Sequence, residues 1–84
     1  MNGATINLLY FARIAELTGK RGQTWALEAP TTTGAQLLDV LQAQYPQLAP
    51  ASRLKLAVNQ THAKNNVRIR AGDEVAVFEP VTGG

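Results

Sequence analysis

One amphipathic helix, bounded at both ends by clear signals, is the sequence feature that most restricts the possible folds. Thr33 and Gln36 have the spacing of a capping box, in which side chains satisfy otherwise unpaired backbone N–H groups. Proline disfavours helical geometry in the residue before it, so the helix is expected to end at Tyr45, which precedes Pro46. Apolar residues between these signals form one helical stripe with Val40 at its edge. The stripe consists of Leu37, Leu38, Leu41 and Tyr45.

Short segments with alternating apolar residues surround this helix and are expected to form strands. The expected strands are 5–11, 23–29, 54–59 and 74–78, with room for a further short strand between the last two. The first is expected to be buried on much of both faces, and a short helix over 12–18 is expected to end at Gly19. The first two strands are expected to pair as an antiparallel hairpin, and Pro30 to stop the second. This order predicts an α+β fold, with a mixed sheet of four to five strands and the main helix across one face.

Length and apolar content are those of one small globular domain. The chain has 84 residues, of which 45% are hydrophobic and 17% charged. We expect a domain over residues 1–78, followed by a flexible tail over 79–84. No apolar run approaches the roughly 20 residues that a membrane span requires. No positively charged leader precedes the first apolar segment, so a cytoplasmic location and no membrane partner are expected.

The composition also excludes several kinds of site. Cysteine is absent, which rules out disulfides, thiolate metal ligands and thiol nucleophiles in this sequence. His62 is the single histidine, and no further ligands with metal-site spacing accompany it, so no metal is expected. The net charge is +2, and a solvated basic face is favoured over nucleic-acid binding because few aromatics are interleaved. The basic residues concerned are Arg53, Lys55, Lys64, Arg68 and Arg70.

The last six residues suggest a different kind of chemistry. Pro80 argues against continued pairing in a central strand. The segment Val81, Thr82, Gly83 and Gly84 follows it, and an extended tail of this length reaches roughly 20 Å beyond Phe78. Glycines without Cβ atoms fit a narrow channel in another protein, and they would deliver an α-carboxylate to its end. A carboxylate is ionised at neutral pH and needs activation, most simply by adenylation with ATP. A frayed end without function is the alternative interpretation.

Three segments resemble the small-subunit family of molybdopterin synthase, the sulfur carriers of molybdenum-cofactor biosynthesis. The first is Leu-Tyr-Phe-Ala-Arg at 9–13 with Glu-Leu-Thr-Gly at 16–19, and the second is Ala-Val-Asn-Gln at 57–60. The third is Gly-Asp-Glu-Val-Ala-Val-Phe at 72–78, continued by Pro-Val-Thr-Gly-Gly at 80–84. The likeness spans nearly the whole chain, and the combination is more specific than the terminal glycine pair alone.

The resemblance implies a β-grasp, ubiquitin-like fold and a tail that carries sulfur. A ubiquitin-activating-like adenylyltransferase would use ATP to adenylate Gly84, and a sulfur donor protein would supply the sulfur of a thiocarboxylate. The tail would then enter the large catalytic subunit, typically within a heterotetramer, and donate sulfur to cyclic pyranopterin monophosphate. Catalytic residues are expected on the large subunit. No bound cofactor is expected on this chain.

Several residues keep two interpretations at this stage. Phe78 is expected either at the partner interface or in ordinary sheet packing, and Arg13 either contacts a partner acid or is a solvated surface residue. Core positions are favoured for Leu54, Leu56 and Trp25, a surface position for His62, and turn hydrogen bonds for Asn59 and Asp73. Three other functions also remain open. They are a sulfur carrier for thiamine synthesis or another thiocarboxylate pathway, a protein modifier, and a plain interaction domain.

Overall fold

The computed structural model describes residues 4–48 and 53–79, which form seven strands and two helices. In chain order these are β1 (Thr5–Tyr10), α1 (Ala12–Thr18), β2 (Gly22–Ala26), β3 (Thr31–Thr33), α2 (Gly34–Gln44), β4 (Lys55–Val58), β5 (Thr61–Ala63), β6 (Arg68–Arg70) and β7 (Glu74–Phe78). The expected main helix, its short companion and all four expected strands are therefore present.

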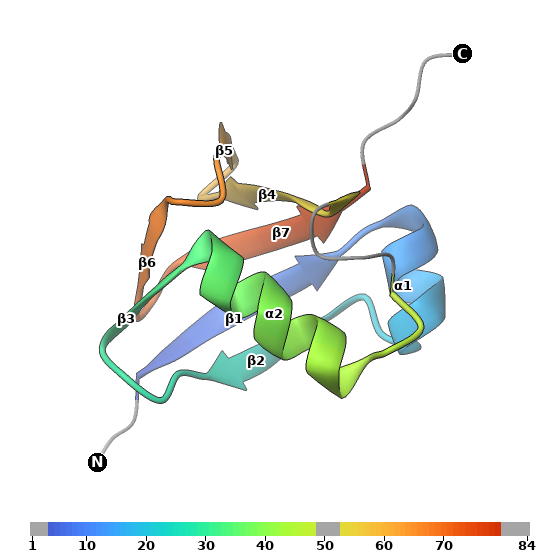
Figure 1. Cartoon of the computed structure of the whole chain (residues 1–84), viewed down its shortest axis with the longest axis horizontal. Coiled ribbons are helices and arrows are strands. Elements are labelled where there is room, and N and C mark those ends of the chain that lie inside the picture. Colours follow the sequence, from blue (N-terminus) through green and yellow to red (C-terminus); the bar gives the residue numbers. More distant parts are fainter. Residues whose placement is uncertain (1–3, 49–52, 80–84) are drawn as a thin grey trace.

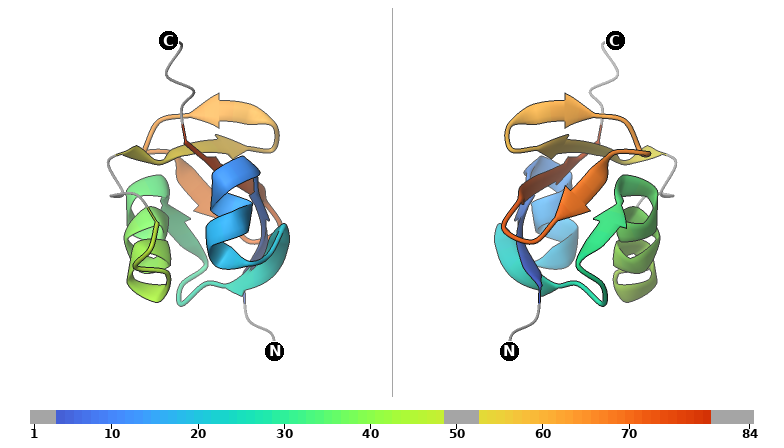
Figure 2. Two further views of the ribbon diagram at one scale, coloured as in Figure 1. Left: turned by 90° about the vertical axis from the view of Figure 1, so that its right-hand side faces the viewer. Right: turned by 90° about the vertical axis from the view of Figure 1, so that its left-hand side faces the viewer.

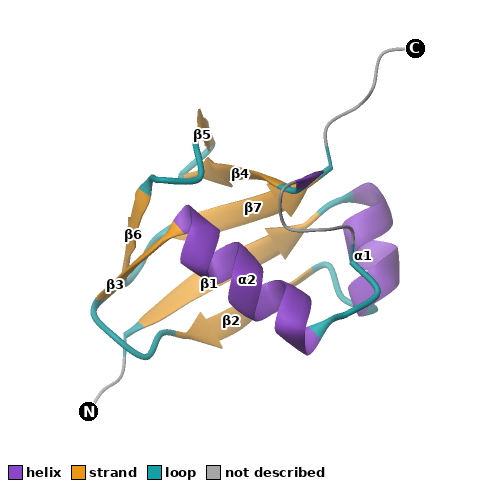
Figure 3. Ribbon diagram, viewed as in Figure 1, coloured by secondary structure: helices purple, strands orange, loops and turns teal. Residues whose placement is uncertain are grey.

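Five strands form one mixed sheet in the order β2-β1-β7-β4-β5 (Figures 1 and 3). The last strand, β7, occupies the centre, parallel to β1 and antiparallel to β4. Helix α2 crosses one face of this sheet, as Figure 1 shows. The predicted α+β architecture is confirmed. Because β7 is central and parallel to β1, Glu79, the residue after β7, lies near the end of β1.

The N-terminus of α2 is held by side-chain and backbone hydrogen bonds. Thr33 and Gln36 form the predicted capping box. The backbone N–H of Gln36 donates to the Thr33 hydroxyl oxygen at 3.2 Å. In return, the backbone N–H of Thr33 donates to the Gln36 side-chain oxygen at 3.2 Å. The Gly34 N–H donates to the Val67 carbonyl at 3.0 Å, and the Ala35 N–H to the Asn65 carbonyl at 2.7 Å. The first turn of the helix is thus tied to the loop between β5 and β6.

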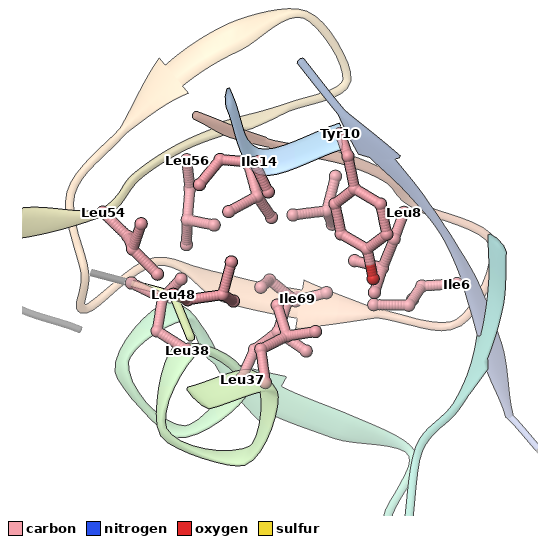
Figure 4. Close-up of a cluster of buried hydrophobic side chains, with 13 residues drawn as sticks. Ile6, Leu8, Tyr10, Ile14, Leu37, Leu38, Leu48, Leu54, Leu56 and Ile69 are labelled. Carbon is pink, nitrogen blue, oxygen red and sulfur yellow. The ribbon is translucent and has the colours of Figure 1, made fainter. Parts of the chain in front are cut away.

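A single apolar core lies between α2 and the sheet (Figure 4). It receives Leu54 and Leu56, as predicted, and Trp25 and Tyr45 pack against it from positions of partial burial. Its buried members are Ile6, Leu8, Tyr10, Ile14, Leu37, Leu38, Leu41, Leu48, Leu54, Leu56, Ile69, Val75 and Val77. Gly34 lies against this core so closely that an added Cβ atom would be 2.6 Å from Leu56 Cδ1.

Tyr10 brings a hydroxyl group to the border of this core. The Gln23 side-chain N–H donates to the Tyr10 hydroxyl oxygen at 2.6 Å and to that of Tyr45 at 3.1 Å. Burial raises the pKa of Tyr10, while the hydrogen bond from Gln23 opposes the shift and the neighbouring Tyr45 adds to it. The polar atom is therefore satisfied within the fold.

Three details differ from the sequence-based expectations. Thr31–Thr33 is a strand as well as a source of N-caps, because β3 pairs antiparallel with β6 in a second, two-stranded sheet (Figure 2). The second strand ends at Ala26 rather than Ala29, since the chain leaves the main sheet to reach β3. Two short strands, β5 and β6, stand where one was expected. These differences come from pairing between segments far apart in sequence.

The first strand also ends earlier and is less buried than predicted. It stops at Tyr10, and its residues alternate between a buried face and a face that is exposed at Thr5 and Asn7. Phe11 lies beyond the strand at the start of α1, and its side chain is 51% exposed. Burial on both faces was therefore the wrong expectation, because α2 covers only one face of β1.

Candidate functional site

The root of the expected tail lies at the end of the central strand. Phe78 is the last residue of β7 and pairs with Lys55 of β4. Its side chain is half-buried on the face of the sheet away from α2, because Val77 beside it points into the core. The His62 ring packs against the Phe78 ring, with centroids 5.3 Å apart and planes tilted by 52°. Phe78 thus combines sheet packing with partial exposure.

Arg13 approaches the same place from α1. Its Nε lies 3.9 Å from Oε1 of Glu79, the residue that follows β7. The Arg13 side chain is 69% exposed and that of Glu79 is 28% exposed. An ion pair this exposed stabilises the fold little. Its significance is positional, since it joins the helix after β1 to the first residue beyond β7.

Phe11 is a surface residue that sequence reasoning did not single out. Tyr10 of β1 pairs with Val77 of the parallel strand β7. Phe11 follows Tyr10, and Phe78 follows Val77. Both phenylalanines therefore lie at the same end of the sheet. Ala12 after Phe11 has φ +48°, a conformation costly for a side chain that bears a Cβ atom. No sequence signal marked Phe11 as exposed, because it continues the apolar run of the first strand and Ala12 follows it.

These residues form what we call the tail-root surface: Phe11, Arg13, His62, Phe78 and Glu79. It continues onto the uncovered face of the main sheet. There Leu9 of β1 lies beside Ala76 of β7, Ala76 beside Ala57 of β4, and Ala57 beside His62 of β5. Small and apolar side chains therefore run across three strands, β1, β7 and β4, and the row ends at His62 of β5. Such a face suits contact with another protein.

The opposite end of β7 is fixed by a side-chain clamp. The Asn59 side chain accepts from the Glu74 N–H at 3.0 Å and donates to an Asp73 carboxylate oxygen at 3.1 Å. The other Asp73 oxygen accepts from the Arg70 N–H at 2.9 Å. Asn59 and Gln60 both have positive φ, which matches a two-residue hairpin between β4 and β5. The expected turn roles of Asn59 and Asp73 are confirmed, and the clamp attaches this hairpin to the start of the central strand.

Among residues 4–48 and 53–79, no group of three or more His, Asp or Glu side chains is arranged to hold a metal ion. In the same ranges no helix is long and apolar enough to cross a membrane. His62 has a surface position as predicted, against Phe78, without an acidic partner at the ring.

The residues expected to carry sulfur follow Glu79 in the sequence. Gly84 and Gly83, together with Thr82, Val81 and Pro80, lie outside the described residues. The structure brings together the two other predicted residues, Phe78 and Arg13, through the strand end and through Glu79.

Comparisons with known proteins agree with this geometry. Residues 8–84 match the family described as the ThiS family. The chain is 39% identical over 82 residues to the molybdopterin synthase sulfur carrier subunit of Escherichia coli (strain K12), with 94% of this chain and 99% of that protein covered. It is 33% identical over 84 residues to the human protein of the same name, with 94% and 93% covered.

A solved structure extends the likeness to three dimensions. The small archaeal modifier protein 1 of H. volcanii superposes with a TM-score of 0.76 at 26% identity, with 94% of this chain and all of that chain covered. The ubiquitin-like β-grasp arrangement expected from the sequence is therefore shared with proteins of known structure.

Proposed function

Because the chain belongs to the ThiS family, we propose that it is a sulfur carrier of molybdenum-cofactor biosynthesis, the small subunit of a molybdopterin synthase. One observation carries the proposal: the likeness to sulfur carrier subunits of that enzyme extends over nearly the full length of both chains. The geometry supports it, since the last strand before the tail is central in the sheet and its end borders the partly exposed tail-root surface.

In this proposal the reacting group is the carboxylate of Gly84. A carboxylate oxygen attacks the α-phosphorus of ATP on an adenylyltransferase, which forms an acyl-adenylate and releases pyrophosphate. Hydrosulfide supplied by a donor protein then attacks the acyl carbon and forms the new C–S bond, AMP leaves as the C–O bond breaks, and loss of the sulfur-bound proton leaves a thiocarboxylate. Inside the large subunit that sulfur passes to cyclic pyranopterin monophosphate. Gly83 has no Cβ atom, so it lets the tail through a narrow channel, and Pro80, Val81 and Thr82 span the distance.

The folded part would position this tail. Phe78 and Phe11 offer apolar surface to the large subunit, and residues of this kind carry much of the energy in protein interfaces. Arg13 either contacts an acidic group of the partner or holds Glu79 so that the tail leaves in one direction. The carrier works in the cytoplasm and binds neither nucleic acid nor a resident cofactor.

Intact-protein mass spectrometry tests the central chemical step. The chain is incubated with ATP, the adenylyltransferase and a sulfur source, and fragmentation then locates any replacement of oxygen by sulfur. Sulfur at Gly84, followed by molybdopterin formation with the large subunit and pterin precursor, is the expected result. Fragmentation is needed because oxidation of Met1 gives nearly the same change in mass. An unmodified terminus with a demonstrably active enzyme would contradict the proposal, as would molybdopterin formation by a variant that lacks both glycines.

The protein-modifier alternative is tested in the same reaction, since the H. volcanii neighbour is named a modifier. Adding a lysine-bearing acceptor protein would then produce conjugates of higher mass that resist hydrolysis. Their formation in place of sulfur transfer would favour that function.

A charge-exchange series separates the two roles of Arg13. The variants are Arg13→Glu, Glu79→Arg and the double variant, with Arg68→Glu as an exposed control on β6. If Arg13 acts by holding Glu79, the double variant restores the internal pair and large-subunit binding. If Arg13 contacts a partner acid, the double variant binds as weakly as Arg13→Glu. If all four variants bind the large subunit equally well, Arg13 has no role in that binding.

A further inference from the structure

A groove lies between α2 and the chain that runs from the end of β2 to β3, and its volume is 540 Å³. Figure 1 shows β2 at the lower edge of the sheet and α2 in front of the sheet. Trp25 and Leu27 line one side of the groove, and Val40 of α2 lines the other. Val40 is 51% exposed, and among the described residues only Phe11 is an equally exposed large apolar side chain. The volume and apolar lining suit the capture of side chains from another molecule.

The strand beside this groove has a free edge. Within the described chain β2 is the outermost strand and pairs with β1 alone. The Leu27 N–H donates to the Ala4 carbonyl at 2.9 Å, so Leu27 directs its backbone groups toward β1. Backbone groups alternate in direction along an antiparallel strand, so Trp25 does the same. The residues between them, Thr24 and Ala26, direct their N–H and C=O groups outward. Natural edges are commonly blocked by lysine or proline, yet β2 contains neither.

Charge identifies the kind of segment that would fit. Glu28 and Asp39 line the groove from opposite sides and are both exposed. No lysine or arginine belongs to its described lining, although the whole chain has a net charge of +2. A negative rim around an apolar floor on a basic protein favours a partner with basic residues.

We propose that this groove binds an extended, basic segment of another protein, which adds a strand to the free edge of β2. Backbone hydrogen bonds would form with Thr24 and Ala26, and alternate apolar side chains would pack against Trp25 and Val40. Lysine or arginine beside them would face Glu28 and Asp39. The groove shares no residue with the tail-root surface, so the proposal goes beyond sulfur carriage and would also hold if the proposed function failed.

A synthetic peptide provides a direct test with the full-length chain. The probe is acetyl-Lys-Lys-Val-Thr-Val-Thr-Val-Lys-Lys-amide, titrated into isotope-labelled protein and followed by amide NMR spectra. The expected result is a shift of the Thr24, Ala26 and Val40 resonances, with slower hydrogen exchange at Thr24 and Ala26. The same peptide with glutamate in place of lysine is expected to bind at least tenfold more weakly, a difference of about 1.4 kcal/mol or more.

Matched variants connect binding to the groove. Val40→Arg is expected to abolish peptide binding, whereas Phe11→Arg, a change at an equally exposed apolar side chain outside the groove, leaves it unchanged. The double variant Glu28→Lys/Asp39→Lys is expected to weaken binding about tenfold. The amide spectrum of each variant shows whether it is folded, and all these positions are exposed.

Three outcomes would overturn the proposal. The first is the absence of shifts along β2 in the wild-type protein, and the second is equal binding of the basic and acidic peptides. The third is a free protein that already dimerises through β2, with Thr24 and Ala26 protected before peptide is added. That last result would assign the groove to a second copy of the chain.

Discussion

Replacement of Asn59 by alanine is expected to lower the free energy of unfolding by about 2–3 kcal/mol. Its side chain accepts from the Glu74 N–H at 3.0 Å and donates to Asp73 at 3.1 Å, and both contacts are lost in the variant. Each is exposed and is worth about 0.5–1 kcal/mol. Asn59 also has φ +50°, where alanine costs roughly 1 kcal/mol more than a residue that tolerates the left-handed region.

Two further variants separate these contributions. Asn59→Gly removes the hydrogen bonds but tolerates the backbone angle, so it is expected to be about 1 kcal/mol more stable than Asn59→Ala. Asn59→Asp keeps an acceptor for the Glu74 N–H but places a second carboxylate beside Asp73. Like charges at hydrogen-bond distance repel, so this variant is expected to be less stable than wild type at neutral pH.

Urea unfolding followed by the fluorescence of Trp25, the single tryptophan, measures these differences. With a slope of about 1 kcal/mol per molar urea, the midpoint of Asn59→Ala should fall by roughly 2 M. An unchanged slope is required for that interpretation. A loss below about 0.5 kcal/mol for Asn59→Ala, or equal stability of the alanine and glycine variants, would refute the reasoning.

Three further predictions concern α2 and the core. Gly34→Ala should destabilise the fold by about 1–3 kcal/mol in the same assay, because the new Cβ atom would stand 2.6 Å from Leu56 Cδ1; a neutral effect would mean that the side chain yields freely. Thr33→Ala should cost about 1 kcal/mol by removing the acceptor for the Gln36 N–H, and circular dichroism should show the helix retained. Burial raises the pKa of Tyr10 above 10.0, so the unfolded chain loses this proton first and stability falls as pH rises from about 10 through the folded-state pKa. Tyr10→Phe should flatten that decline, and an identical pH profile for the two proteins would contradict the assignment.

Local sequence signals placed most elements because their physical causes are local. The capping box, the leucine stripe and Pro46 lie within one segment, and α2 begins and ends where they indicate. Gly19 ends α1 at φ +74°, a conformation in which glycine carries no steric penalty. The alternation in 54–59 and 74–78 predicted two strands and the burial of Leu56, since side chains on a strand alternate with period two.

The candidate site was only partly readable in the same way. The sequence indicated Phe78 by its place beside the tail and Arg13 by its place in a segment that resembles the family. Phe11 was instead assigned to a buried strand. Its exposure depends on where β1 ends and on α2 covering a single face of the sheet. The pair between Arg13 and Glu79 joins segments 66 positions apart, and it exists because β1 and β7 run parallel side by side.

The sequence by itself determined the kinds of element, their order and the family to which the chain belongs, because capping, turn chemistry and hydrophobic period act over a few residues. Tertiary structure decided which faces stay uncovered. It paired β3 with β6, left the edge of β2 open beside α2, and brought His62 against Phe78. Each of these results depends on contacts between distant segments, whose pairing is settled when the whole core packs and not by the residues of either segment alone.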